Sequence, residues 1–287
     1  MPQVLDWHVE ADLANIRPGA IELQSALHER MYSSIFDRRE SAIEWLNGGR
    51  TYWRLQTLYK LETLIETPLQ GRILEIGAGV GWCSGVLSHS SAVSEVYALE
   101  YDPYCVNTLM PKVHKCLDAD VEKVHYVHGS FNHIPESNAF DLIVSMGALH
   151  HSENLQQTLQ ACYDALRPGG YLLASEPVEQ NSLSIAAERQ KENKDDVHSV
   201  RKYGRPTQHK DNSDHYYRLC QYESTAYFAG FNVWPFLFDH ETGTPASDAI
   251  FQNRTCYDGH QIIVHQPFFA RENLYDGLML VLQKPIL

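Results

Sequence analysis

The sequence lacks three features that would each indicate a particular class of protein. Its six cysteines form no C-x-x-C pair, which argues against a disulfide framework and against a cysteine zinc site. No apolar run approaches membrane-spanning length, and the first residues carry acids where a signal peptide has basic side chains. We therefore expect a cytoplasmic protein that binds no metal.

Positive charge is also scarce. The 287 residues include 23 Lys and Arg against 36 Asp and Glu, which gives a formal net charge of −13. Such a chain repels the phosphates of nucleic acids and of anionic membranes, so we expect neither as a partner. With 44% hydrophobic and 21% charged residues, the composition is that of an ordinary globular protein.

The chain divides into two parts by the spacing of its apolar residues. Residues 1–70 have apolar side chains three and four positions apart, which predicts a helical N-terminal extension. From residue 71 onward, short β-branched runs alternate with helical stretches, which predicts an α/β domain over residues 71–287 with a mostly parallel sheet. Polar stretches at about 179–217 and 239–277 interrupt this rhythm and are predicted to be insertions.

A glycine-rich turn follows the first predicted strand of this domain. Gly77, Gly79 and Gly81 lie between that strand and a predicted helix, where glycine permits unusual backbone angles and lets a ligand approach the main chain. Dinucleotide-binding enzymes use a similar turn with the pattern G-x-G-x-x-G. Here Trp82 occupies the position of the last glycine and Glu75 precedes the turn, so the sequence disfavours a dinucleotide.

This turn resembles motif I of the class I S-adenosylmethionine (SAM)-dependent methyltransferases, and the resemblance covers roughly residues 71–178. It implies a Rossmann-like, seven-stranded, mostly parallel sheet with helices on both faces, and SAM as the cofactor. Glu100 ends the second strand about 20 residues after the turn, where nucleotide-binding sheets place an acid on the ribose hydroxyls.

The resemblance also implies which residues surround the rest of the cofactor. Phe131 would pack on the adenine, next to Ser130, which replaces the acid usual in the family; Ser145 and Met146 would line the methionine part. The complete set of candidate cofactor residues is Glu75, Gly77, Ala78, Gly79, Gly81, Trp82, Glu100, Tyr101, Ser130, Phe131, Ser145 and Met146.

Methyl transfer from SAM needs alignment and, for a hydroxyl or ammonium acceptor, a base that removes a proton. His150 and His151 follow the fourth strand and titrate in the useful range, while Tyr216 and Tyr217 end the first insertion. These four are the candidate catalytic residues. The histidine pair is equally explained as a helix-entry feature and the tyrosines as packing, so both alternatives stay open.

The extension and the two insertions could roof the site, which favours a small-molecule acceptor of natural-product or glycan type, methylated on oxygen or nitrogen. One alternative is an enzyme of the same fold that transfers or cyclises the aminocarboxypropyl arm and releases methylthioadenosine. Others are a non-catalytic SAM-binding subunit and, least favoured, an NAD-dependent oxidoreductase. The acceptor, the pathway and the choice between monomer and homodimer stay open at this point.

Overall fold

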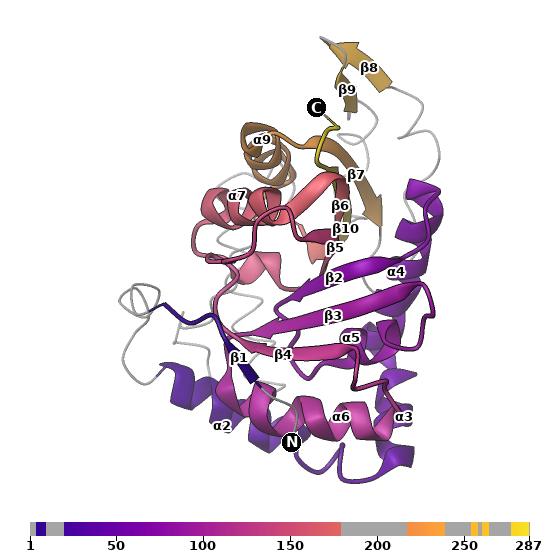
Figure 1. The fold of residues 1–287 in the computed structure, drawn as a ribbon, viewed down its shortest axis with the longest axis vertical. Helices are drawn as coiled ribbons and strands as arrows, with labels where there is room; N and C mark the ends of the chain where they lie inside the picture. The colour runs from indigo at the N-terminus through magenta and orange to yellow at the C-terminus, as the bar shows by residue number, and fades with distance from the viewer. Residues whose placement is uncertain are drawn as a thin grey trace, which may run out of the picture.

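A computed structural model describes residues 4–9, 20–178, 217–238, 254–257, 260–263 and 277–286. Its centre is an eight-stranded sheet with the strand order β1-β4-β3-β2-β5-β6-β10-β7 (Figure 1). The strands are β1 (Val4–Asp6), β2 (Gly71–Ile76), β3 (Val93–Glu100), β4 (Val124–His128), β5 (Phe140–Met146), β6 (Leu166–Pro177), β7 (Asn232–Phe238) and β10 (Gly277–Gln283). Strands β8 (Arg254–Tyr257) and β9 (His260–Ile263) form a separate antiparallel pair.

The direction of the strands determines where a ligand site can form. Strands β1 to β6 pair in parallel, and β10 lies antiparallel between β6 and β7. The carboxyl ends of β2, β3, β4, β5 and β6 therefore lie along one edge of the sheet. Open α/β sheets bind ligands at this edge, where the order of the strands reverses. Here the reversal falls between β2 and β5.

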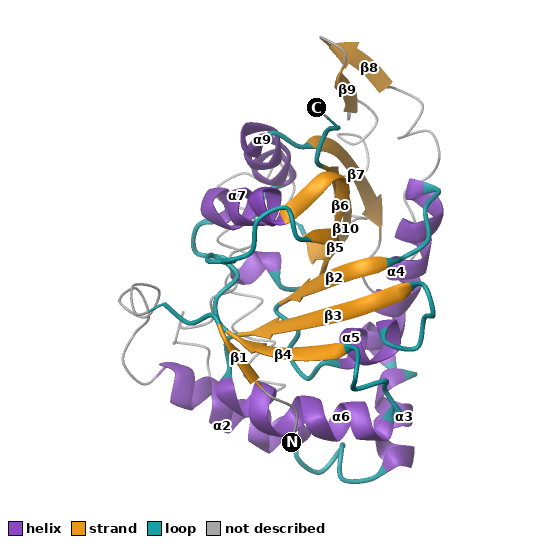
Figure 2. Ribbon diagram, in the orientation of Figure 1, coloured by secondary structure: helices purple, strands orange, loops and turns teal. Residues whose placement is uncertain are grey.

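Helices cover both faces of the sheet (Figure 2). Leu58 and Leu61 of α4 pack on one face with Val144 of β5, whereas Leu159 of α7 and Tyr222 of α9 pack on the other. The helices are α2 (Ala20–Tyr32), α3 (Arg39–Leu46), α4 (Gly49–Ile65), α5 (Trp82–Leu87), α6 (Met110–Cys116), α7 (Leu155–Ala165) and α9 (Leu219–Ala229). None of these described helices has the length and apolar character needed to cross a lipid bilayer.

The predicted α/β architecture is confirmed, with two differences in detail. The extension was expected to be entirely helical with a seven-stranded sheet beyond it, but Val4–Asp6 adds an eighth strand parallel to β4. The Trp7 amide continues this pairing by donating to the carbonyl of His128 at 2.8 Å. Three residues are too few for a strand periodicity to be visible in the sequence.

The second difference concerns the helical stretch between β3 and β4. Its first half is a π-helical segment, η1 (Cys105–Leu109), and only Met110–Cys116 is α-helical. Of the two predicted insertions, the first lies outside the described residues except for Tyr217, and the second is described only at β8, β9 and Gly277.

Candidate cofactor and methyl-transfer site

The glycine turn has the geometry that its sequence predicts. Gly77, Gly79 and Gly81 have φ angles of +63°, +55° and +79°, in the left-handed region that favours glycine. The Ala78 amide donates to the carbonyl of Leu99 at 2.9 Å, which fixes the turn against the end of β3. A Cβ built on Gly79 would meet no heavy atom within 4 Å, so this glycine faces open space.

Glu100 lies directly beside this turn. One carboxylate oxygen accepts the Gly79 amide at 2.8 Å, and the other accepts the amides of Tyr101 and Asp102 at 2.8 and 2.9 Å. A carboxylate offers about four acceptor positions, so three backbone donors orient it and leave room for a hydroxyl of a ligand. Glu100, the acid predicted to bind the ribose, therefore lies at the carboxyl edge of the sheet in a fixed orientation.

Glu75 and Trp82 lie behind the turn. The Glu75 carboxylate is 2% exposed and accepts the Ser84 amide of α5 at 2.8 Å. Trp82 is also buried and packs in the core on the face covered by α4. Both residues were predicted as part of the cofactor site; the structure shows their contacts with the protein interior, where they support the turn from below.

The burial of Glu75 predicts a pH dependence of stability. Burial raises the pKa of Glu75 from its ordinary value near 4.5 to about 8, and hydrogen bonds from Ser84 oppose this shift only in part. Between these two values the folded protein binds a proton that the unfolded chain releases, so stability falls as pH rises and levels off above pH 8. The free energy of unfolding of the wild type should decline by several kcal/mol relative to Glu75→Gln over this range.

Urea unfolding of both proteins at pH 5, 6, 7 and 8 measures this difference, because all other titrating groups are shared. Parallel pH profiles for the two proteins would show that Glu75 is already ionised at pH 5.

The loop after β4 is the predicted adenine site. The Ser130 hydroxyl accepts the Asn132 amide at 3.1 Å and so stabilises the loop itself. Phe131 is half-buried, and a Cβ on Gly77 would lie 3.8 Å from its ring. The aromatic ring thus borders the glycine turn. Trp7 covers Gly129 at the start of this loop.

The end of β5 is organised by a carboxylate that the sequence analysis did not identify. Glu176, at the end of β6, is fully buried and accepts the Ser145 hydroxyl at 2.7 Å. It also accepts the amides of Ala148 and Leu149, both at 3.0 Å, and its other oxygen lies 2.8 Å from Nδ1 of His150. The Ser145 hydroxyl therefore points to Glu176, while Met146 is buried in the core.

These contacts decide the charge of Glu176. Burial by itself would raise the pKa of Glu176, but the His150 imidazole, the Ser145 hydroxyl and the Leu149 amide outweigh burial, so the pKa is lowered. An ionised Glu176 makes His150 Nδ1 the donor of their shared hydrogen bond. The other ring nitrogen, Nε2, is then the one that can accept a proton.

The remaining candidate catalytic residues gather partly around the same turn. His150 and His151 belong to the 3-10 segment η2 (Leu149–His151), with ring centroids 4.0 Å apart. The Tyr217 hydroxyl donates to the carbonyl of Ser152, which brings the end of the first insertion to this turn. Tyr216 lies outside the described residues.

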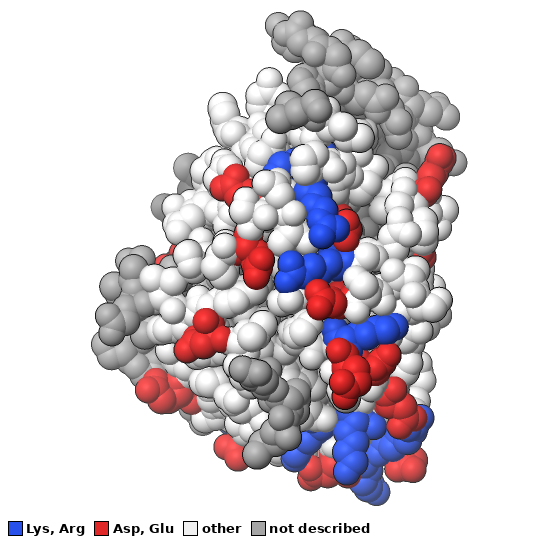
Figure 3. Space-filling model, in the orientation of Figure 1, with Lys and Arg blue, Asp and Glu red and all other residues white. Residues whose placement is uncertain are grey.

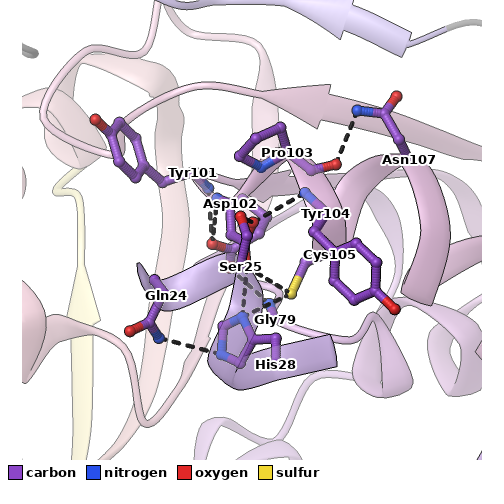
Figure 4. A network of polar contacts seen from close by, with 11 residues as sticks. Gln24, Ser25, His28, Gly79, Tyr101, Asp102, Pro103, Tyr104, Cys105 and Asn107 are labelled. Atoms are coloured by element: carbon purple, nitrogen blue, oxygen red, sulfur yellow. Dashed lines mark hydrogen bonds and ion pairs between the residues drawn. The ribbon is translucent and has the colours of Figure 1, made fainter. Parts of the chain in front are cut away.

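Asp102 joins the N-terminal extension to the site (Figure 4). Its carboxylate accepts the Ser25 hydroxyl at 2.5 Å and contacts Nδ1 of His28, also at 2.5 Å; both residues belong to α2. With Cys105, His28 and Asp102 place three possible metal ligands within 4.8 Å. However, two ligands of tetrahedral zinc lie about 3.3 Å apart, so the shorter His28–Asp102 distance indicates a direct hydrogen bond.

Glu176 and the α2 contacts were missed because they join segments that are distant in sequence. The local sequence around Glu176 shows only an acid near the end of the apolar run that forms β6. Nothing near Ser25 or His28 indicates that they contact Asp102, since about 75 residues separate the partners.

Two glycine substitutions distinguish the roles of the turn. Gly79→Ala adds a methyl group toward open space, so we expect a folded protein, about 1–2 kcal/mol less stable because of its left-handed backbone, that binds S-adenosylhomocysteine at least tenfold more weakly. Gly77→Ala would instead overlap the Cβ of Ala148 and should lower the melting temperature further. Thermal unfolding and calorimetry measure both effects. Unchanged binding by Gly79→Ala would show that no ligand approaches there.

This chain is similar to known methyltransferases. A family model described as "Methyltransferase domain" matches residues 74–174. The chain is 26% identical over 179 residues to the tRNA U34 carboxymethyltransferase of Pseudoalteromonas atlantica, covering 58% of this chain and 54% of that protein. It is 32% identical over 109 residues to the mitochondrial ubiquinone biosynthesis O-methyltransferase of Rattus norvegicus, covering 37% and 30%.

The fold is likewise that of solved methyltransferases. The structure superposes on phosphoethanolamine N-methyltransferase 2 of Haemonchus contortus with a TM-score of 0.56 and 18% identity, covering 86% of this chain and 57% of that one. The described sheet and helices thus have the Rossmann-like fold of solved methyltransferases, and residues 74–174 of this chain match a methyltransferase domain. The chain spans about half the length, or less, of the curated relatives described above.

Proposed function

We propose that this protein transfers a methyl group from SAM to oxygen or nitrogen of a small-molecule acceptor. The observation that carries this proposal is the Glu100 carboxylate, oriented by three backbone amides beside a glycine that faces open space. A carboxylate in this position suits ribose hydroxyls, and the open backbone of Gly79 admits the rest of the cofactor.

Described residues are available for three parts of SAM. Glu100 would accept a ribose hydroxyl, Phe131 would pack on the adenine, and the turn around Gly77 would contact the methionine part. When bound, SAM supplies an electrophilic methyl group on a sulfonium. The protein then has to align the acceptor and exclude water, because the donor already carries the positive charge.

His150 is the residue we propose as the base. The buried Glu176 orients its ring at the carboxyl end of β5 and fixes which nitrogen carries the proton. This arrangement suits an acceptor that must lose a proton, such as a hydroxyl or an ammonium group. His151 and Tyr217 adjoin the same turn and are proposed to line the acceptor site with Tyr216.

The acceptor is proposed to be a small molecule, although one relative is named as a tRNA-modifying enzyme. The net charge of −13 opposes RNA. On the face shown in Figure 3, Lys and Arg side chains are interspersed with Asp and Glu. Among the described residues, basic groups also form ion pairs, for example Arg167 with Asp141 at 2.7 Å and Lys112 with Asp37 at 2.8 Å.

The test is to incubate the full chain with methyl-labelled SAM and a panel of phenols, carboxylic acids and amines, with bulk tRNA as a separate sample. Mass spectrometry should detect S-adenosylhomocysteine together with a methylated small molecule. Methylthioadenosine formed without an acceptor would support the aminocarboxypropyl reaction instead. Label recovered in tRNA alone would overturn the small-molecule acceptor.

A further inference from the structure

An arginine from the N-terminal extension lies against the loop that follows β5. Gly147 has a φ of +81°, and a Cβ built on it would lie 2.6 Å from Cζ and 3.1 Å from Nε of Arg54. The guanidinium of Arg54 is therefore packed over Gly147. Any larger residue at position 147 would displace this cation. The absence of a side chain at Gly147 therefore leaves the space that the guanidinium occupies.

The position of α4 explains how Arg54 reaches this loop. Helix α4 packs on the sheet through Leu58 and Leu61 and ends at Ile65, shortly before β2 begins. The end of α4 thus lies near the amino edge of the sheet, and its first turns extend toward the carboxyl edge. Arg54 lies in the second turn of the helix, at the edge where the glycine turn lies.

Arg54 is also close to the part of the turn that faces away from Glu100. A Cβ on Gly77 would overlap Ala148, the residue after Gly147, so the tip of β5 touches the tip of β2. The strand order places β3 on one side of β2 and β5 on the other. A cofactor whose ribose is bound by Glu100 on β3 therefore extends its amino-acid end over β2 toward Gly147.

Two acids at this edge show why an anionic ligand group needs a cation. Glu100 and Glu176 lie at the carboxyl ends of β3 and β6. The amino-acid end of SAM carries a carboxylate that these acids cannot accept. We propose that Arg54 binds this carboxylate, which makes the N-terminal extension a part of the cofactor site. The inference rests on the proposed cofactor and not on the identity of the acceptor.

Calorimetry with two ligands tests this role. S-adenosylhomocysteine carries the carboxylate, whereas 5′-methylthioadenosine has the same nucleoside and no amino-acid part. For Arg54→Gln we expect S-adenosylhomocysteine to bind about 10- to 100-fold more weakly, the effect of losing a charge-assisted hydrogen bond, with methylthioadenosine unchanged within about twofold. Arg54→Lys should recover part of the affinity because it restores the charge without the planar fork.

Arg39→Gln is the matched control, because Arg39 is an exposed arginine of the same extension that pairs with Asp118. It should bind both ligands as the wild type does. Unchanged affinity of Arg54→Gln for S-adenosylhomocysteine, or an equal loss for both ligands, would overturn the assignment. If the wild type binds neither ligand, the proposed cofactor itself fails, which is distinguishable from a failure of Arg54 alone.

Discussion

Replacing Glu100 by alanine should weaken the binding of S-adenosylhomocysteine by about 100-fold, since hydrogen bonds to a charged group contribute roughly 1.5–3 kcal/mol each. The carboxylate lies at the end of β3 and is oriented by the amides of Gly79, Tyr101 and Asp102. The variant loses both the contact with the ribose and the bond that fixes the glycine turn. Calorimetry of the wild type and the variant measures the change.

Glu122→Ala is the control for this experiment, because Glu122 is an exposed acid just before β4. It should leave the affinity unchanged and show that the effect is not one of net charge. The thermal unfolding of Glu100→Ala should be recorded as well. A folded variant that binds S-adenosylhomocysteine as tightly as the wild type would show that the ribose is bound elsewhere.

Replacing His150 by alanine should lower kcat by a factor of about 100 to 10,000, the range typical of a general base. Binding of S-adenosylhomocysteine should persist, because His150 lies on the β5 side of the turn and Glu100 is unaffected. The assay is methyl transfer to whichever acceptor the panel identifies. Glu176→Gln should lower kcat less, because it keeps the shape of the side chain and loses only the charge that orients the imidazole.

His89→Ala serves as the comparison, since His89 is exposed and contacts the carbonyl of Leu117. Its kcat should equal that of the wild type. If His150→Ala retains full activity but unfolds at lower temperature, then the histidine only stabilises the buried Glu176, and the acceptor loses its proton by another route.

The pH dependence separates these two roles further. If His150 is the base, the pH profile of kcat for the wild type should have a limb that is absent from the residual activity of His150→Ala. A purely structural histidine would leave the shape of the profile unchanged.

The glycine turn and Glu100 could be predicted from the sequence because their geometry is local. The left-handed angles of Gly77, Gly79 and Gly81 need glycine whatever surrounds them, and the strand that precedes the turn sets its position. The position of Glu100 at the end of the second strand could be predicted from the usual length of one βαβ unit. The alternation of strands and helices likewise predicted the sheet, apart from its short eighth strand.

Other features of the site required the tertiary structure, because their partners are distant along the chain. Glu176 becomes a structural centre only where β6 lies beside β5, and its lowered pKa depends on His150 and Ser145. The same holds for the carboxylate of Asp102, which α2 contacts through Ser25 and His28. The sequence near the end of a strand does not indicate which distant loop will contact its side chains.

The sequence by itself therefore determined the fold class and the cofactor, since both depend on backbone conformation and on spacing within one strand–turn–helix unit. The tertiary structure decided which groups lie around the predicted cofactor site. It placed Glu75 beneath the turn, joined Glu176 to His150 and brought Arg54 from the extension onto Gly147. Packing of α4 on the sheet and pairing of β5 with β6 produce these contacts, and both depend on the completed core.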